Sequence, residues 1–471
     1  METANMKQFI FDWIDKNGAP FDEAADFLWQ NPELGMEEHK SSAKLIQLLE
    51  KYGFAVERGV AGMPTAFVAT YTCGSGNPVI GFSAEYDALP GLSQEVGTAK
   101  KALREGAPGH GCGHNLLGTT AIYAAIATKQ ALEQKKLSGT LKVFGTPAEE
   151  LCVGKPFMAR AGLFKGVDVL LDWHPMNYNR ADYDVCNAYF NVKYHFKGKT
   201  AHGNSPWFGR STLDAAMLQA HAVELLREHI RPSTLGPEAA NTVNYTFSDV
   251  GPEFPSVVPD RTTAWYVGRF DQTELMVEVM ERIDNCAKGA AMATETTVEK
   301  ELITATHDKI PNKVLAEVMH RNLEEIGAPK FTEEEQEFVK AMQREVGAAE
   351  TGLDETIMPF GGGSSGVCDT SEYSWDVPYV ILWVTMAPAG VGWHNWIVAS
   401  CSGSGIGKKA MNTAAKIIAA TALDLAVSPE TVKAARAEQG ERLAQRNYIA
   451  LLPQELLPPV GINKAVMEKY R

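Results

Sequence analysis

The clearest functional motif of this chain is the segment Pro108-Gly109-His110-Gly111-Cys112-Gly113-His114-Asn115-Leu116-Leu117. It places Cys112 and His114 two positions apart among glycines. In an extended or tightly turned segment, residues two apart project to the same side of the backbone. Thiolate and imidazole both bind borderline transition metals, and glycine allows the backbone angles that a close wrap demands. The segment therefore predicts a metal site, although an ordinary glycine-rich loop is the alternative.

Three further strand-like runs are followed by side chains that can bind a metal or a ligand. These are residues 78–83 followed by Glu85 and Asp87, residues 140–145 followed by Glu149 and Glu150, and residues 167–173 followed by His174. Ligands of open α/β sheets bind where the strands end. Glu85 and Asp87 are therefore predicted to bind substrate, with turn-capping acids as the alternative. Glu149 and Glu150 point to opposite sides of an extended backbone, so one can bind a metal while the other reaches a water there.

Length and composition limit the number of domains and the kinds of partner that can be expected. A chain of 471 residues is too long for one ordinary core, so two domains, or one domain interrupted by a second, are expected. Hydrophobic residues at 45% and charged residues at 22% are typical of a soluble globular protein. The formal net charge of -14 argues against a nucleic acid or an anionic membrane as partner, because both need an excess of Lys and Arg. A small-molecule partner is favoured.

Cysteine usage and apolar segments indicate the compartment. Seven scattered cysteines, an odd number, do not suggest a disulfide framework in a chain of this length. The N-terminal segment mixes charges into its apolar positions and lacks the uninterrupted apolar region of a signal peptide. Residues 410–427 contain Lys416 and Asp424 and are expected to form a packed helix. We therefore expect a cytoplasmic protein with no nucleic-acid or membrane partner.

The order of predicted elements indicates an inserted domain. Residues 5–53 are expected to be helical and residues 65–71 and 78–83 to form a strand pair, whereas the glycine-rich residues 360–375 are expected to be a long flexible loop. Strand and helix patterns between residues 189 and 302 follow the order β-α-β-β-α-β of a ferredoxin-like unit. The predicted boundaries are a catalytic domain at 1–187 and 306–471, the latter with the C-terminal tail, and an insertion at 188–305. Within the insertion, His202 follows a turn and Arg269 ends a strand, and either could be ordinary surface.

Five motifs occur in one order along the chain. They are GHGCGHN at 109–115, TPAEE at 146–150, DWHP at 172–175, KGKTAHG at 197–203 and GWHNW at 392–396. With them the sequence resembles the dinuclear metallopeptidase superfamily of aminoacylase and glutamate carboxypeptidase, and within it the B-type subunits of p-aminobenzoyl-glutamate hydrolases. The resemblance implies an α/β fold, with a mixed-sheet, zinc-peptidase-like catalytic domain and an inserted ferredoxin-like α+β lid and dimerisation domain.

The resemblance also implies roles for single residues. The implied ligands of two divalent metal ions, manganese or zinc, are Cys112, His114, Glu150, His174 and His394. Glu149 is similar to the general base. His202 is similar to a lid histidine that, in dimeric relatives, reaches the partner's active site and stabilises the oxyanion, and Arg269 to a lid arginine that holds the substrate carboxylate. A homodimer through the lid domain is implied, with a second kind of subunit as the alternative.

The sequence departs from the family pattern at two positions near the metal site. Ser83 stands where many relatives have a histidine ligand, and Asn115 stands where an aspartate often follows the Cys-x-His pair. Thiolate and imidazole ligation by Cys112 and His114 is expected to replace the missing histidine.

The predicted function is metal-dependent cleavage of the amide bond of an N-acyl or N-aroyl amino acid that carries a free carboxylate. The leading candidate substrate is p-aminobenzoyl-glutamate. The alternatives are dipeptide cleavage, hydrolytic removal of an amine from an aromatic ring, and an inactive homologue that acts as a binding partner or as one half of a two-subunit enzyme. Five tryptophans could form an aromatic-acyl pocket or belong to the core, namely Trp173, Trp207, Trp375, Trp393 and Trp396.

Overall fold

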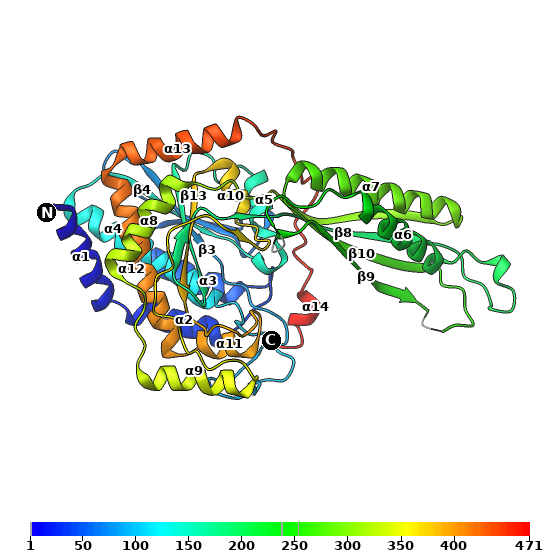
Figure 1. Ribbon diagram of the computed structural model, residues 1–471, viewed down its shortest axis with the longest axis horizontal. Coiled ribbons are helices and arrows are strands. Elements are labelled where there is room, and N and C mark those ends of the chain that lie inside the picture. Colours follow the sequence, from blue (N-terminus) through cyan, green and yellow to red (C-terminus); the bar gives the residue numbers. More distant parts are fainter. Residues whose placement is uncertain (1, 237–238, 253) are drawn as a thin grey trace.

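The molecule has a large lobe and a smaller, elongated second lobe (Figure 1). The computed structural model describes residues 2–236, 239–252 and 254–471. The large lobe is built on a seven-stranded mixed sheet and the second lobe on a four-stranded antiparallel sheet. The predicted α/β class, with a mixed catalytic sheet, is confirmed.

The large sheet has the strand order β1-β2-β4-β3-β5-β13-β6. Its strands are β1 Ala55–Arg58, β2 Phe67–Cys73, β3 Val79–Ala84, β4 Gly139–Gly145, β5 Val169–Met176, β6 Arg180–Asp182 and β13 Tyr379–Thr385. Strands β4, β3, β5 and β13 run parallel, and the remaining pairs are antiparallel. The predicted pairing of β2 with β3 is wrong, because β4 lies between them. The connection from β2 to β3 crosses the start of β4, where Ser75 N donates to Ser138 Oγ at 3.0 Å.

Both faces of the large sheet are covered by helices. Side chains alternate along each strand, so Phe82, Val143 and Leu171 face one apolar cluster while Phe144 and Leu170 face the other. The first face packs against α1 Glu2–Lys16, α2 Ala19–Gln30, α3 His39–Lys51, α4 His114–Lys135, α8 Lys313–Ile326, α11 Trp396–Ser402 and α12 Gly405–Val427, with α9 Glu333–Glu345 and α13 Pro429–Leu443 outside them. The second face packs against α5 Gly154–Arg160 and α10 Ser371–Asp376.

Helix α12 is long and apolar enough to cross a membrane when judged by length and composition alone. It lies inside the large lobe, and 67% of its most apolar window is buried against the rest of the protein. This agrees with the packed helix that the sequence predicted for residues 410–427.

The second lobe has the topology of a ferredoxin-like unit. Its elements are β8 Ala188–Lys197, α6 Thr212–Leu226, β9 Thr242–Gly251, β10 Arg261–Phe270, α7 Thr273–Ala293 and β11 Thr297–Thr306. The strand order is β11-β8-β10-β9, and both helices pack on one face of the sheet (Figure 1). The chain enters the lobe through β8 and leaves through β11, and these two strands are neighbours, with Tyr189 opposite Thr306.

The glycine-rich segment 360–375 is not the long flexible loop that its composition predicted. It contains the short strand β12 Ser364–Ser365, which pairs with β7 Val185–Cys186, and it ends in α10. Its acids Asp369 and Glu372 are buried. Asp369 pairs with Lys155 on α5, and Glu372 contacts His307, which follows β11, so these contacts tie the segment to both elements.

The C-terminal segment follows α13 and runs down between the two lobes to α14 Lys464–Met467 (red in Figure 1). At its start, Arg446 pairs with Glu274 and Asp308. Farther on, Leu451 and Leu452 are buried in the cluster that also holds the base of the second lobe. The segment therefore contacts both lobes, in keeping with the surface-wrapping tail that the sequence predicted.

Candidate active site and metal centre

The ends of three neighbouring parallel strands carry the predicted site. Strands β4, β3 and β5 lie side by side, and their carboxyl ends meet at one edge of the sheet. Glu85 follows β3, Glu149 and Glu150 follow β4, and His174 lies near the end of β5. These side chains therefore lie at the same edge of the sheet.

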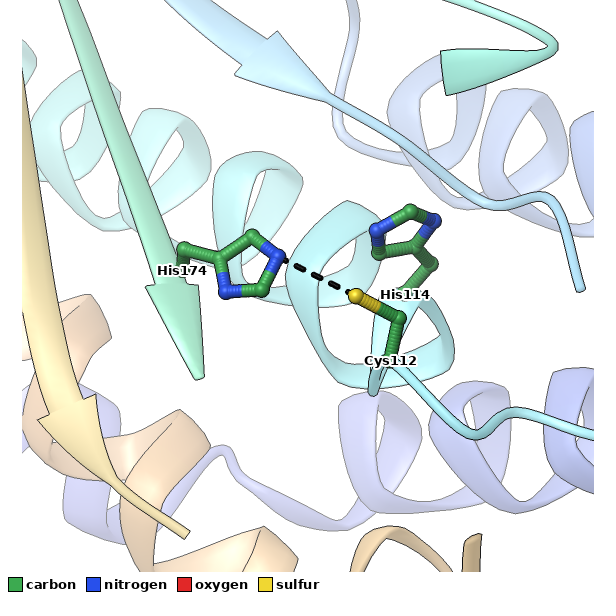
Figure 2. Close-up of side chains that lie close together, drawn as sticks. All are labelled: Cys112, His114 and His174. Atoms are coloured by element: carbon green, nitrogen blue, oxygen red, sulfur yellow. Dashed lines mark hydrogen bonds between the residues drawn. The ribbon is translucent and has the colours of Figure 1, made fainter. Parts of the chain in front are cut away.

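The loop before α4 brings Cys112 and His114 to the same edge. His114 is the first residue of α4, and Gly113 before it has a φ of 82°, a left-handed conformation that glycine adopts without strain. The Cys112 sulfur and the His174 Nε2 atom are 3.3 Å apart. Figure 2 shows both imidazole rings beside that sulfur, one at the start of α4 and the other on β5.

The five predicted ligands form two triads that share one sulfur. Cys112, His114 and His174 make one group, and Cys112, Glu150 and His394 make the other. Within each group the potential ligand atoms lie within 4.8 Å of one another. A shared thiolate between two sets of nitrogen and oxygen ligands suits a pair of borderline divalent cations.

Hydrogen bonds orient the two buried histidines for binding a cation. The Nδ1 atom of His174 donates to the Pro175 carbonyl at 2.6 Å, since a carbonyl can only accept. The Nδ1 atom of His114 lies 3.0 Å from Asp87 Oδ1. Both rings therefore direct the Nε2 lone pair to the cluster, the arrangement found at metal sites. His114 Nε2 and Glu150 Oε1 are buried without a hydrogen-bond partner, which fits atoms that bind an ion.

The two glutamates after β4 are held in a constrained turn. Glu149 begins the 3-10 turn Glu149–Leu151, and the residues on either side, Ala148 and Cys152, have positive φ angles of 56° and 55°. Such angles cost a non-glycine residue energy and are concentrated at functional sites. Burial raises the pKa of Glu149 well above its usual range, and the charges of Glu85 and Glu150 raise it further. A carboxylate with a raised pKa suits proton transfer near neutral pH.

Glu149, Glu150, Cys112, His174 and His394 open into one cavity of about 530 Å³. His114 lies fully buried beneath them. The remaining wall contains Met176, Tyr178, Tyr189, Arg269, Lys309, Trp383 and Trp393. The cavity therefore combines the predicted metal ligands and base with aromatic and cationic side chains.

Arg269 and His202, the two predicted residues of the second lobe, occupy different environments. Arg269 lines the cavity, and its nearest partner is the neutral amide of Asn244, at 3.3 Å. His202 is exposed and lies outside the residues that line the cavity, and its Nδ1 atom accepts from the Asn204 backbone N–H at 3.0 Å. Within one chain, the structure therefore brings Arg269 but not His202 to the cluster.

Asp87 and Glu85, the two acids predicted to bind substrate, lie in different places relative to the cavity. Asp87 is buried behind the cluster, where it contacts His114 and accepts from the Glu150 backbone N–H at 2.9 Å. It orients two predicted ligands and is shielded from a substrate. Glu85 does reach the cavity wall, but its Oε1 atom is paired with Lys155 Nζ at 2.7 Å.

Asn115, one of the departures from the family pattern, is a structural residue. Its side-chain amide donates to the carbonyls of Ala25 and Ser402.

Several residues of the site escaped sequence reasoning. Trp383 lies on a buried strand with no distinguishing spacing, yet its ring centroid is 5.6 Å from that of His174. Among the five tryptophans considered for an aromatic pocket, Trp393 alone lines the cavity. Lys155 and Cys368 were also missed, because their partners are far away in the sequence.

Comparison with known proteins identifies the family. The family model described as peptidase family M20/M25/M40 matches residues 81–424. The chain belongs to peptidase family M20/M25/M40. It is 33% identical to the B-type subunit of the p-aminobenzoyl-glutamate hydrolase of Escherichia coli K12, over 96% of this chain and 98% of that protein. It is 29% identical to the Xaa-Arg dipeptidase of Mus musculus, over 92% of each chain.

A solved structure supports the same family fold. The dinuclear metal-binding peptidase of family M20 from Bacillus subtilis superimposes with a TM-score of 0.54 at 19% sequence identity, over 87% of this chain and 99% of that one. Membership of family M20 makes the chain an amidohydrolase and implies divalent metal ions. The two triads around Cys112 are groups that fit such ions.

Proposed function

We propose that the protein cleaves the amide bond of an N-aroyl amino acid with a free carboxylate, p-aminobenzoyl-glutamate being the first candidate. One observation carries the proposal. Four of the five predicted ligands, all but the buried His114, line a single cavity together with Glu149 and Arg269, and the wall of that cavity is rich in aromatic rings. The B-type subunit of the Escherichia coli p-aminobenzoyl-glutamate hydrolase, which is similar over nearly the full length, supports the choice of substrate.

The cation centre would be held by the two triads that share Cys112. When bound, two divalent cations, manganese or zinc, lower the pKa of a water molecule and polarise the scissile carbonyl. Glu149 takes a proton from the attacking water and delivers it to the leaving nitrogen, which its raised pKa allows. Asp87 keeps His114 and Glu150 in place during these steps.

Arg269 would hold the substrate carboxylate. A guanidinium matches a carboxylate with two parallel hydrogen bonds, and Arg269 forms no ion pair with any residue that the structure describes. Such bonds contribute about 1.5 to 3 kcal/mol when one partner is charged, or roughly 10- to 150-fold in binding.

The aromatic wall favours an aroyl over an aliphatic acyl group. The ring centroids of Trp383 and Trp393 lie 5.6 Å and 6.4 Å from that of His174, and Tyr178 packs 6.1 Å from Trp383. A benzoyl ring entering beside His174 would meet these faces and edges at the distances that aromatic pairs prefer.

A homodimer through the second lobe is part of the proposal. Large apolar side chains are exposed there, including Trp207, Phe208 and Phe254 in the region of His202. Exposed apolar patches of this kind mark protein interfaces. A second copy would cover them and bring its His202 to the oxyanion position of the first, where one donor contributes about 3 kcal/mol. A different partner subunit is the alternative.

The test is a substrate panel with the metal-loaded protein. The panel contains p-aminobenzoyl-glutamate, its α-carboxamide analogue, an N-acetyl amino acid and an Xaa-Arg dipeptide, and released amino acid is measured. We expect p-aminobenzoyl-glutamate to be cleaved with the highest kcat/KM. Preferred cleavage of the dipeptide, or no cleavage by protein that holds its metal, would refute the proposal.

A variant pair tests the role of Arg269. We expect Arg269→Met to raise KM for p-aminobenzoyl-glutamate about 10- to 150-fold and to leave the α-carboxamide analogue unaffected. The matched control is Arg261→Met, since Arg261 lies at the exposed end of the same strand and pairs with Asp249 at 3.4 Å. Equal losses on both substrates would contradict carboxylate recognition by Arg269.

A further inference from the structure

Cys368 is a cavity residue whose thiol contacts the predicted general base. It lies between β12 and α10, and its sulfur donates to Glu149 Oε1 at 3.1 Å. The Thr370 hydroxyl donates to the same sulfur, also at 3.1 Å. The sulfur thus receives one hydrogen bond and gives one, which aims its S–H at the carboxylate. The second oxygen of Glu149, Oε2, is left facing the cluster, 3.7 Å from His114 Nε2.

The segment that carries Cys368 is anchored from below by a buried ammonium group. Lys155 on α5 is fully buried, and its Nζ atom lies 2.5 Å from Asp369 Oδ1 and 2.7 Å from Glu85 Oε1. Its backbone N–H also donates to Asp369 Oδ2, at 3.3 Å. One side chain therefore joins α5, the end of β3 and the segment next to Cys368.

Lys155 also affects whether the neighbouring acids can bind a metal ion. Glu85, Cys368 and Asp369 lie close enough together to hold a metal ion. The Lys155 ammonium already pairs with both carboxylates of this group. The Lys155 ammonium therefore occupies the position that a metal ion would take in this group. The group has a structural role beside the two triads.

We propose that Cys368 is a positioning residue for Glu149, and that the Lys155 and Asp369 ion pair fixes the segment that presents it. The last torsion angle of a glutamate rotates over a broad range when nothing restrains it. A donor on Oε1 holds the carboxylate plane and leaves Oε2 free to take the proton. The inference rests on the proposed function, since it assigns Glu149 as the base.

Kinetics provides the first test. Cys368→Val removes the donor and leaves an apolar side chain that is larger by one heavy atom, whereas Cys368→Ser keeps a donor. With the best substrate of the panel, we expect Cys368→Val to lower kcat about tenfold with KM and bound metal per chain unchanged, and Cys368→Ser to recover most of the loss. The matched control is Cys401→Val, because Cys401 is a fully buried cysteine on α11 outside the cavity. Wild-type kcat in Cys368→Val, or a change in KM or metal content alone, would overturn the inference.

Infrared spectroscopy provides a second test that needs no substrate. The S–H stretch falls in a spectral window free of other protein bands, and the difference between wild type and Cys368→Val isolates the band of Cys368. We expect this band to be broad and lower in frequency than that of an unbonded thiol, and to move to higher frequency in Glu149→Gln. A band that Glu149→Gln leaves unchanged would refute the contact, whether or not the protein cleaves any member of the panel.

Discussion

Replacing Asp87 by asparagine should weaken metal binding although none of the predicted ligands is replaced. The Asp87 carboxylate contacts His114 Nδ1 at 3.0 Å and accepts from the Glu150 backbone N–H at 2.9 Å. An asparagine offers one oxygen and one NH2 group. It can accept only one of these two bonds, and its NH2 group faces the other donor.

The size of the effect follows from the donor that is left unpaired. A buried unsatisfied donor costs about 1 to 3 kcal/mol, which corresponds to roughly 5- to 150-fold in an equilibrium constant. Loss of a residue that orients a metal ligand typically costs about 10- to 100-fold in affinity. We therefore expect the Kd for zinc or manganese to rise by about 10- to 100-fold in Asp87→Asn.

Competition with a chromophoric chelator measures this affinity directly, and elemental analysis gives the metal retained per chain. The matched control is Asp168→Asn. Asp168 accepts from the Val79 backbone N–H at 2.8 Å at the opposite edge of the sheet, so its loss should lower stability and leave metal affinity unchanged. Wild-type affinity in Asp87→Asn, or equal weakening in both variants, would refute the role given to Asp87.

Three further predictions concern proton transfer, stability and pH. Glu149→Gln should lower kcat about 100- to 10,000-fold while KM and bound metal stay the same, measured by product release; a variant with wild-type turnover would exclude Glu149 as the base. Lys155→Met should lower the free energy of unfolding by about 3 to 5 kcal/mol in urea titrations, because Glu85 and Asp369 are left buried without their cation; a loss under 1 kcal/mol would contradict this. Burial, aided by the charge of His114, lowers the pKa of His110 to about 3, whereas a histidine in the unfolded chain titrates near ~6.5. The stability that His110 contributes is therefore complete above pH ~6.5 and is lost as the pH falls towards 3, at up to about 1.4 kcal/mol per pH unit, and His110→Gln should flatten this part of the unfolding profile of the metal-free protein.

The position of the candidate site was predictable from the sequence because most of its functional side chains lie in short segments next to the ends of strands. Cys112 and His114 are two residues apart, and Glu149 and Glu150 are adjacent, so short segments already carry most of the pattern. His394 is remote, and a motif from the family resemblance was needed to find it. The ferredoxin-like lobe was predictable because its strands and helices alternate in a characteristic order.

The supporting residues could not be predicted from the sequence for a physical reason. Lys155 and Asp369 are 214 positions apart, and neither spacing nor periodicity links them before the chain has folded. The same partnership explains the error over residues 360–375, because the glycines suggested mobility while the buried acid keeps the segment ordered. The pairing of β2 with β3 failed because a short connection suggests a hairpin, and nothing local shows that β4 enters between the strands.

The attachment of the second lobe through two neighbouring strands affects which substrates fit. Arg269 belongs to the sheet of that lobe, whereas Glu149 and the triads belong to the sheet of the large lobe. The span between the carboxylate anchor and the scissile bond therefore depends on the angle between the lobes, which are connected by β8 and β11, where Tyr189 pairs with Thr306, and bridged by the C-terminal segment. A change in that angle would alter the length of molecule accepted while leaving the bond-breaking groups untouched.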